Sequence, residues 1–430
     1  MKIKINHLLL LLLILQVITN LIGALGPELG FDSLWYHLTT SKIFLERHSI
    51  NPIPGNLLYW SGLPRLGELI YALGLYLWDE RLPKLTHLVF GILSAHQVYL
   101  LAKKYFSKTS GLIATNLFYS TLLVGWLSTT SYIDLIVTFF LLLALNVKKW
   151  WAKAIAIILA SATKLHAVVI GLAITLVPWG ILGVLPFAAI NQKVTGNFFY
   201  PFLENFGFES EWLYNGFWFW FSRPLRLFFD PIFRVGPIIL ILFIFSIKKP
   251  INKKNLYTLT SVFLIWWLGP GTGFGRFALF LLSLLSIQAS SLFIKNKNKY
   301  LLFLVVAHSL LGIVGRAWAN QKYLPVILHK QTKQQFLAQR LKFDFGDFYD
   351  IDNWFKDNIK PSDKVLVYNI HNLFYLDFPF DHESWATKNS NYTHILVGAN
   401  ASLPKEHGNL PLLYQNDTSQ VKLYLNDQSN

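Results

Sequence analysis

Four charged side chains stand where charge is costly in this sequence. Asp32 lies in "GFDSLWYHLTTSKIF", just after the first apolar segment, and Asp134 lies in "TTSYIDLIV", just before another. Lys164, in "ASATKLHAVV", interrupts a long apolar run, and Arg276 follows the glycine-rich stretch "GPGTGFG". An ionised group at the edge of hydrocarbon is unfavourable unless it is hydrated, paired or bound to a ligand. These four residues are therefore the first candidates for chemistry.

The two carboxylates suit acid–base chemistry. A general base for a hydroxyl or amide acceptor needs a partly desolvated carboxylate, and we expect Asp32, just outside a span, to be such a group if it lies in a cavity. Asp134 is the second such acid, and the two together can also share a divalent cation through oxygen ligands, so metal dependence stays open. Each has a simpler alternative, because an aspartate at the start of a helix often accepts hydrogen bonds from its free backbone N–H groups.

The two cations suit an anionic ligand such as a phosphate. A lysine serves as a point charge, and a guanidinium beside free backbone N–H groups suits a phosphate or pyrophosphate. The alternative for Lys164 is an ammonium that reaches a nearby membrane interface along its own stem. The alternative for Arg276 is an interfacial arginine in a loop.

Composition predicts an α-helical polytopic membrane protein. The 430 residues are 53% hydrophobic and 14% charged, with a mean hydropathy of +0.40, whereas soluble domains carry roughly 25% charged residues. The absence of cysteine excludes disulfides and thiolate metal sites. The net charge of +15 comes from lysine clusters in short loops between apolar runs. This distribution indicates membrane topology and argues against nucleic acid as a partner.

The apolar runs predict the membrane spans. They lie at about 7–25, 84–102, 110–130, 132–147, 152–190, 235–247, 255–269, 274–294 and 300–318. With the N-terminus and every lysine cluster in the cytoplasm, the long run 152–190 crosses an odd number of times. Three crossings, with breaks near Pro178 and Pro186, give 11 spans, and one crossing gives 9. All 23 Asp and Glu residues then lie on the outer side.

Three larger pieces are expected on that outer side. Region 26–83 holds two amphipathic stretches, which predict interfacial helices. Region 191–233 is dense in aromatic residues, as an interfacial belt or a lid would be. The chain therefore divides into a transmembrane domain, 1–320, and a small extracytoplasmic α/β domain, 321–430. In the latter the pattern predicts a helix at 347–359 and strands at 364–370, 394–398 and 421–425.

The ordered set of motifs resembles the GT-C superfamily of polytopic glycosyltransferases. The bacterial relatives of protein O-mannosyltransferases and the lipid A aminoarabinose transferases (glycosyltransferase family 39-like) are the most similar in pattern. The resemblance is carried by "FDSLWYHLTTSKIFLERHSI", "YIDL", "ASATKLHAVV", "TGNFFYPF" and "GFGRFALF", which follow the family's order over about residues 1–320. One departure is that many relatives have two adjacent acids in the first loop, whereas Ser33 follows Asp32 here.

This resemblance implies transfer of a sugar from a polyprenyl-phosphate-linked donor on the outer face of the cell membrane. The acceptor can be protein, lipid or glycan. Asp32 then corresponds to the first-loop catalytic acid and Asp134 to the second outer-loop acid. Lys164 and Arg276 correspond to basic positions near the lipid phosphate.

Three further residues are candidates for substrate contacts. Trp35 and Tyr36 follow the first-loop acid, and aromatic faces stack well on sugar rings. His37 is adjacent and can assist the acid, although a hydrogen-bonded structural role is its alternative.

Two other functions are compatible with the same sequence. One is a transporter or flippase of lipid-linked glycans, and the other is a catalytically inactive scaffold with the GT-C fold. A transporter needs a polar path across the whole membrane, and the inner halves of the predicted spans carry few ionisable groups. Replacing Asp32 by Asn separates these functions, because only a transferase depends on that carboxylate.

Overall fold

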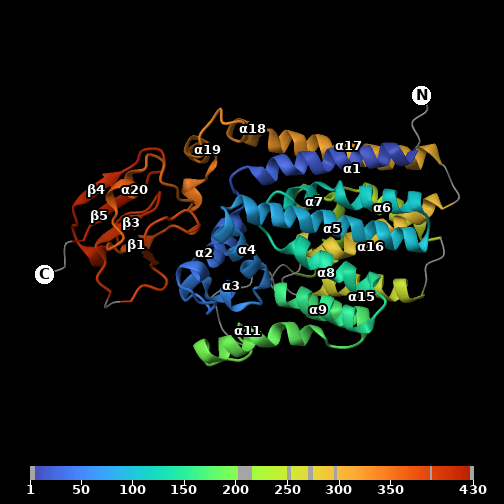
Figure 1. The fold of residues 1–430 in the computed structure, drawn as a ribbon, viewed down its shortest axis with the longest axis horizontal. Coiled ribbons are helices and arrows are strands. Elements are labelled where there is room, and N and C mark those ends of the chain that lie inside the picture. The colour runs from blue at the N-terminus through green and yellow to red at the C-terminus, as the bar shows by residue number, and fades with distance from the viewer. Residues whose placement is uncertain are drawn as a thin grey trace.

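An α-helical bundle forms one end of the molecule and a small unit built on a sheet forms the other (Figure 1). The computed structural model describes residues 5–201, 216–248, 253–269, 275–294, 298–387 and 390–426. The N-terminus lies at the end of the bundle far from the sheet, and the C-terminus lies beyond the sheet. The end of the bundle that lies next to the sheet is called the sheet end. This architecture confirms the predicted helical protein with a small C-terminal α/β domain.

The long apolar runs of the sequence form the helices of the bundle. They are α1 (Ile5–Leu25), α5 (Arg81–Tyr105), α6 (Lys108–Tyr119), α7 (Leu122–Leu127), α8 (Asp134–Asn146), α9 (Trp150–Thr163), α10 (Ala167–Thr175), α11 (Gly180–Thr195), α14 (Ile238–Ser246), α15 (Lys253–Leu268), α16 (Leu279–Ala289) and α17 (Lys299–Asn320). Within the described residues, four helical segments are long and apolar enough to cross a membrane, namely Ile5–Leu25, Arg81–Tyr105, Gly275–Phe293 and Lys299–Ile327. The predicted count of 11 spans, or 9, stays a prediction.

The bundle carries apolar side chains on its outside as well as in its core. Leu10, Leu11 and Ile14 of α1 are exposed, and so are Leu311 and Val314 of α17. A soluble protein rarely exposes such a surface, so these faces suit lipid. Inside, buried leucine, isoleucine and valine side chains of α1, α5, α6, α8 and α16 share one continuous core.

Two predicted spans are interrupted. The run 152–190 forms α9, α10 and the first part of α11, with breaks at Lys164 and near Pro178, whereas Pro186 lies inside α11. The run 110–130 divides into α6 and α7 at Ser120. Gly312 of α17 packs directly against this break, because a Cβ at that position would overlap the carbonyl oxygen of Ser120.

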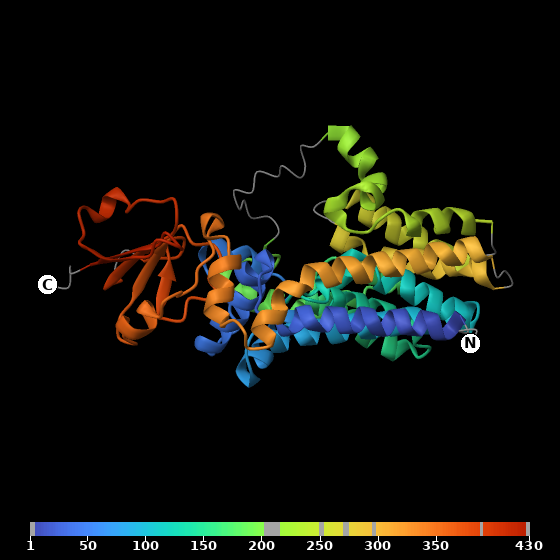
Figure 2. The same cartoon turned by 90° about the horizontal axis from the view of Figure 1, so that it is seen from above.

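The first loop region is helical, as its amphipathic pattern predicts. Residues Ser33–His37 form a π-helical turn that continues into α2 (Leu38–Glu46), and α4 (Leu66–Leu77) follows after the short α3 (Leu58–Gly62). Within the aromatic region, α13 (Gly216–Phe229) lies at the side of the bundle (Figure 2). Residues 202–215 of that region are outside the described residues.

The C-terminal unit is a mixed sheet with short helices. Its helices are α18 (Leu324–Ile327), α19 (Lys333–Arg340) and α20 (Trp354–Asn358), and its strands are β1 (Val365–Tyr368), β2 (Phe380–His382), β3 (His394–Val397), β4 (Leu412–Gln415) and β5 (Lys422–Leu425). In the described part of the chain the strand order is β2-β1-β3-β5-β4. Strand β1 is parallel to β2 and β3, and β5 is antiparallel to β3 and β4.

This unit confirms the three predicted strands as β1, β3 and β5. The predicted helix at 347–359 is only partly correct, because helix begins after Asn353, which has a positive φ of 63°. The sequence did not predict β2 and β4. The proposed domain boundary after residue 320 stays a prediction, although α17 ends there.

The sheet unit is fastened to the first loop region. The ammonium of Lys42 in α2 donates hydrogen bonds to the carbonyl oxygens of Phe374 (3.0 Å) and Leu376 (2.7 Å). The hydroxyl of Tyr375 donates to the carbonyl oxygen of Glu28 at 3.0 Å. The segment between β1 and β2 therefore lies directly over the loop that carries Asp32.

Candidate active site

Asp32 is paired with Arg276. Nη1 of Arg276 donates to Oδ2 of Asp32 at 2.5 Å, and the hydroxyl of Tyr36 donates to the same oxygen at 2.9 Å. The Asp32 and Arg276 side chains are 17% and 15% exposed, so the pair is partly accessible. Asp32 precedes the π-helical turn, and Arg276 lies in a short 3-10 turn (Gly275–Ala278) that leads into α16. Such π turns are frequent at functional sites.

Asp134 is paired with Lys164. The ammonium of Lys164 donates to Oδ1 of Asp134 at 2.7 Å, and the Lys164 and Asp134 side chains are 19% and 2% exposed. Asp134 is the first residue of α8, where the positive end of the helix dipole favours a carboxylate. Lys164 directly follows α9, where the negative end of that dipole favours a cation. The break in the long apolar run thus puts the lysine beside this acid.

The two pairs form one cluster. Arg276 interacts electrostatically with both Asp32 and Asp134. The ring of Phe277 lies close to both cations, because its centroid is 4.4 Å from the Lys164 ammonium and 5.4 Å from the Arg276 guanidinium. The structure therefore brings all four predicted residues together from four separate segments of the chain. We call them the charged cluster.

A buried carboxylate ties together the two loops that carry the acids. Oε1 of Glu28 accepts hydrogen bonds from the backbone N–H groups of Leu29 (2.9 Å) and Gly30 (2.7 Å). Oε2 accepts from the backbone N–H of Ser131 at 2.7 Å. Glu28 is 1% exposed, so these bonds replace its hydration. They hold the segment before Asp32 against the segment before Asp134.

The three aromatic and imidazole candidates differ in their surroundings. Tyr36 is buried and stacks on Trp60 with ring centroids 4.4 Å apart. Burial and the nearby Asp32 carboxylate raise the pKa of Tyr36 well above its ordinary value, so it stays neutral and donates to Asp32. Trp35 is half-buried and packs edge-on against Trp60. Its ring is therefore the more accessible of the two for a substrate.

His37 has a structural partner. Its Nδ1 lies 2.6 Å from Oε1 of Glu68 in α4, and both residues are buried. Its ring also packs against Tyr132, with centroids 5.6 Å apart. These contacts hold α4 against the start of α2. They match the hydrogen-bonded structural role that the sequence offers as the alternative for His37. A direct substrate contact by His37 stays a prediction.

The simpler alternatives for the two acids do not describe their bonding. Asp32 makes no side-chain capping hydrogen bond to the following turn. Asp134 is the first residue inside α8 and its Oδ1 bonds Lys164. The sequence also predicts free backbone N–H groups beside Arg276, and these belong to the glycine-rich segment before it. Residues 270–274 of that segment lie outside the described residues.

The sequence did not single out Glu28, Tyr132 or Glu68. The partner of Glu28 across the cluster is 103 residues away, and no local pattern reveals such a bond. Tyr132 carried the clearest signal of the three, because it stands two residues before Asp134 in the motif "YIDL". Its ring lies 5.1 Å from the Arg276 guanidinium and so forms one wall of the charged cluster.

The residues present give a divalent cation little to bind. Within the described ranges, no group of three or more His, Asp or Glu side chains is arranged to hold a metal ion. Each acid of the charged cluster already has a cationic partner, Arg276 or Lys164.

No protein-family model and no curated protein sequence matches the chain. The structure is similar to a crystal structure of ArnT from Cupriavidus metallidurans bound to undecaprenyl phosphate, with a TM-score of 0.68 and 11% identity over 98% of each chain. The apo state of the same ArnT gives a TM-score of 0.61 and 11% identity, also over 98% of each chain. The apolar helices and this similarity show a multi-pass membrane protein with a fold like that of ArnT.

Proposed function

We propose that the protein transfers a sugar from a polyprenyl-phosphate-linked donor to an acceptor at the membrane surface. The observation that carries this proposal is the charged cluster, in which two acids and two cations from distant segments meet while one pair stays partly accessible. The ArnT fold supports it, because one structure with that fold holds undecaprenyl phosphate.

In the proposed reaction Asp32 is the base. An acceptor hydroxyl or amide attacks the anomeric carbon of the donor sugar, and its proton passes to the Asp32 carboxylate. The bond between the anomeric carbon and the phosphate oxygen breaks, and its electron pair leaves on the polyprenyl phosphate. The products are the glycosylated acceptor and the free lipid phosphate, so no oxidant or further reactant is needed.

In this proposal Arg276 and Lys164 stabilise the leaving phosphate. The donor phosphate is a diester with one negative charge, and a second charge develops as the sugar leaves. Cations that meet this added charge bind the transition state more tightly than the ground state. A guanidinium has five N–H donors and an ammonium has three, so each can keep its acid and still contact phosphate oxygens.

We propose that the sheet end lies outside the cell membrane, as the lysine distribution predicts. Lys103 and Lys104 lie in the last turn of α5, and Lys148 and Lys149 precede α9. These loops belong to the end of the bundle that holds the N-terminus, away from the sheet (Figure 1). Positive residues next to spans favour the cytoplasm, so the charged cluster would face outward.

The test compares Asp32→Asn with Asp417→Asn in cells and in purified protein. Asp417 is exposed in the sheet unit and is the matched control. We expect Asp32→Asn to lower the amount of glycosylated envelope product by about 10²–10⁴-fold, the usual contribution of a general base. Binding of undecaprenyl phosphate to the purified variant should stay within a few-fold of wild type.

Two outcomes would reject the proposal. Envelope glycans that match wild type in Asp32→Asn, while cells that lack the protein differ from wild type, would indicate a transporter or a scaffold. Absence of undecaprenyl phosphate binding in the wild-type protein would remove the lipid-linked donor.

A further inference from the structure

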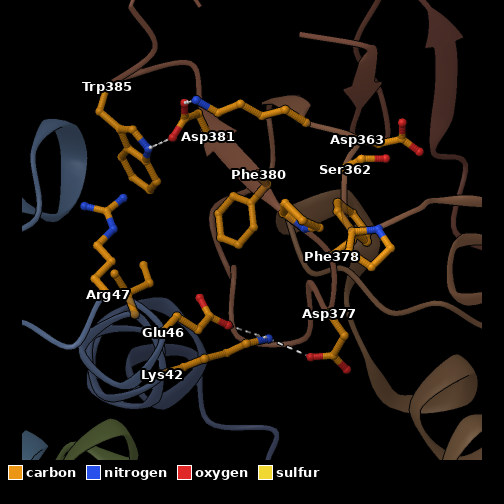
Figure 3. A pocket seen from close by; sticks show the side chains of 14 residues that line it. Lys42, Glu46, Arg47, Ser362, Asp363, Asp377, Phe378, Phe380, Asp381 and Trp385 are labelled. Carbon is orange, nitrogen blue, oxygen red and sulfur yellow. Dashed lines mark hydrogen bonds and ion pairs between the residues drawn. The ribbon is translucent and has the colours of Figure 1, made fainter. Parts of the chain in front are cut away.

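A cavity of about 750 Å³ lies between α2 and the sheet unit (Figure 3). One wall consists of Lys42, Ile43, Glu46 and Arg47 from α2 and its C-terminal end. The other wall comes from the segments before β1 and around β2, namely 361–364, 377–381 and Trp385. None of the residues of the charged cluster lines this cavity, and the proposed reaction makes no use of it. We call it the α2–sheet cavity.

The charged side chains of the cavity walls are largely paired with one another. Lys42 lies 2.6 Å from Asp377, and Lys364 lies 2.6 Å from Asp381. Asp381 is held further, because Nε1 of Trp385 donates to its Oδ1 at 3.1 Å (Figure 3). The Lys42–Asp377 pair joins the two walls, whereas the bonds of Asp381 lie within the sheet-unit wall. These bonds leave carboxylate oxygens with lone pairs that can accept hydrogen bonds from a ligand.

The cavity contains aromatic surface next to these polar groups. Phe378, Phe380 and Trp385 are each half-buried and line the same wall. The rings of Phe380 and Trp385 are 6.4 Å apart and inclined at 45°. Aromatic faces bind apolar C–H surfaces, and the adjacent carboxylates accept hydrogen bonds from hydroxyl groups. Sugar rings present both surfaces at once.

The charge balance disfavours a phosphate or a strongly charged ligand. Three cations, Lys42, Arg47 and Lys364, face four acids, Glu46, Asp363, Asp377 and Asp381, which gives a net charge of −1. Two of the cations are already paired at 2.6 Å. A neutral, hydroxyl-rich ligand meets no electrostatic penalty here, because it needs donors and acceptors rather than net charge.

Helix α2 connects this cavity to the charged cluster. Asp32 stands before the helical segment and Glu46 ends it, 14 residues later. At 1.5 Å per helical residue, this separation is about 21 Å. A single sugar cannot occupy both places, whereas an extended chain can. The spacing therefore suits an acceptor whose end reaches Asp32 while a more distant part occupies the cavity.

We infer that the α2–sheet cavity binds the carbohydrate chain of an extended acceptor glycan. This inference rests on the proposed function for the identity of the ligand as acceptor. Phe378, Phe380 and Trp385 supply the stacking surface, and the paired acids receive the hydroxyl groups. A peptide acceptor is the alternative, and the experiment distinguishes it from a glycan.

The experiment measures binding of envelope oligosaccharides to the full-length protein in lipid nanodiscs. The probes are oligosaccharides released from the envelope of cells that lack the protein, and a peptide digest of the same envelope. The variants are Trp385→Ala, Trp385→Phe and Arg47→Ala. Trp318→Ala is the matched control, because Trp318 lies on α17 and is 75% exposed.

We expect the wild-type protein to bind an oligosaccharide fraction, and Trp385→Ala to bind it at least tenfold more weakly. Trp385→Phe should keep part of the affinity because it keeps an aromatic face. Arg47→Ala, an exposed position on the opposite wall, should weaken binding about threefold, whereas Trp318→Ala should match wild type. If Trp385→Ala fails to fold, the Trp385→Phe and Arg47→Ala results still decide.

Three outcomes would overturn the inference. They are no oligosaccharide binding by the wild-type protein, equal binding by wild type and the cavity variants, and binding of the peptide digest alone. Asp32→Asn separates this inference from the proposed function, because it should retain oligosaccharide binding. If Asp32→Asn leaves transfer intact while Trp385→Ala loses binding, the reaction scheme fails and the carbohydrate site stands.

Discussion

Asp32 and Arg276 are 244 residues apart in the chain, yet Nη1 of the arginine lies 2.5 Å from Oδ2 of the aspartate. The pair joins the first loop region to the start of α16, across the sheet end of the bundle. A base that is already bonded to a guanidinium is held in one orientation. When an anionic phosphate enters, some of the five N–H donors of Arg276 can bond the phosphate while others stay bonded to Asp32.

The first prediction concerns the guanidinium of Arg276. Arg276→Gln removes the positive charge, and we expect transfer to fall by about 10²–10³-fold, as for loss of one group that stabilises a developing oxyanion. Arg276→Lys keeps the charge but loses the planar fork, so it should recover only part of the rate. The measurement is the initial rate of product formation together with the affinity for undecaprenyl phosphate.

Arg340→Gln, at an exposed position at the end of α19, is the control for this prediction. It should transfer at the wild-type rate. If Arg276→Gln did the same, Arg276 would have no part in the reaction and would serve only to hold Asp32.

The second prediction concerns the buried pair of Asp134 and Lys164. Lys164→Met leaves a carboxylate that is 2% exposed without its partner. We expect a loss of stability of about 3–5 kcal/mol, the usual cost of an uncompensated buried charge. Lys164→Met combined with Asp134→Leu should recover much of that stability but none of the activity. Thermal inactivation of undecaprenyl phosphate binding measures the first effect, and product formation measures the second.

Stability of the double variant below that of Lys164→Met would contradict the second prediction. It would mean that Asp134 supports the fold through contacts other than its ion pair. Recovery of transfer would exclude Asp134 from the site.

The third prediction concerns Glu28, which links the two loops of the charged cluster. Glu28→Gln keeps the shape but replaces one acceptor oxygen with an N–H₂ group, which cannot accept from Ser131 or from Gly30. We expect a loss of about 1–3 kcal/mol for the unsatisfied backbone donor. Transfer should fall as well, because the two acids are no longer held in register.

Faster hydrogen exchange at the amides of Gly30 and Ser131 would locate the effect of Glu28→Gln. The exposed Glu406, which accepts a hydrogen bond from Tyr368 in the sheet unit, gives the control Glu406→Gln. Equal stability and transfer in both variants would rule out the link as a positioning device.

The fourth prediction concerns the pH dependence of the sheet unit. Burial lowers the pKa of His382 from 6.5 to about 4, and the nearby His371 acts in the same direction. Between these values the unfolded chain binds a proton that the folded unit does not, so stability falls as the pH drops from about 6.5 to 4. At pH 5 the loss amounts to about 2 kcal/mol.

Hydrogen exchange of the amides of β1 and β3 measures this loss at pH 7 and pH 5, after correction for the intrinsic exchange rate. His382→Gln should remove most of the pH dependence in this range. His394, whose pKa is also lowered by burial, accounts for a remaining part in the same direction. An unchanged pH dependence in His382→Gln would show that His382 is not its source.

Much of the fold could be predicted because the membrane and the interface impose simple periodicities. Long apolar runs became helices, and the amphipathic stretches of region 26–83 became α2 and α4. The predicted strands at 364–370, 394–398 and 421–425 were visible because apolar and β-branched residues cluster in them. Strand β2 has only three residues and directly follows Pro379, so its formation depends on pairing with β1 rather than on a local pattern.

The charged cluster could be foreseen only in part. Charge in an apolar setting singled out Asp32, Asp134, Lys164 and Arg276, because the cost of burial makes such residues rare. The sequence around each residue could not predict its partner, because each ion pair joins two distant segments of the chain. The role of Glu28 and the α2–sheet cavity depend on how the C-terminal unit sits against the first loop region, which no periodicity in the sequence encodes.

The hydrogen bonds of Glu28 also bear on how far such a sequence can diverge. Because the acids are aligned by a cross-link between loops, the lipid-facing helix surfaces need only suitable length and apolar character. Leucine, isoleucine, valine and phenylalanine can replace one another there with little effect on the distant loops. Substitutions of this kind change the sequence and leave the architecture in place, so a similar fold is compatible with 11% identity.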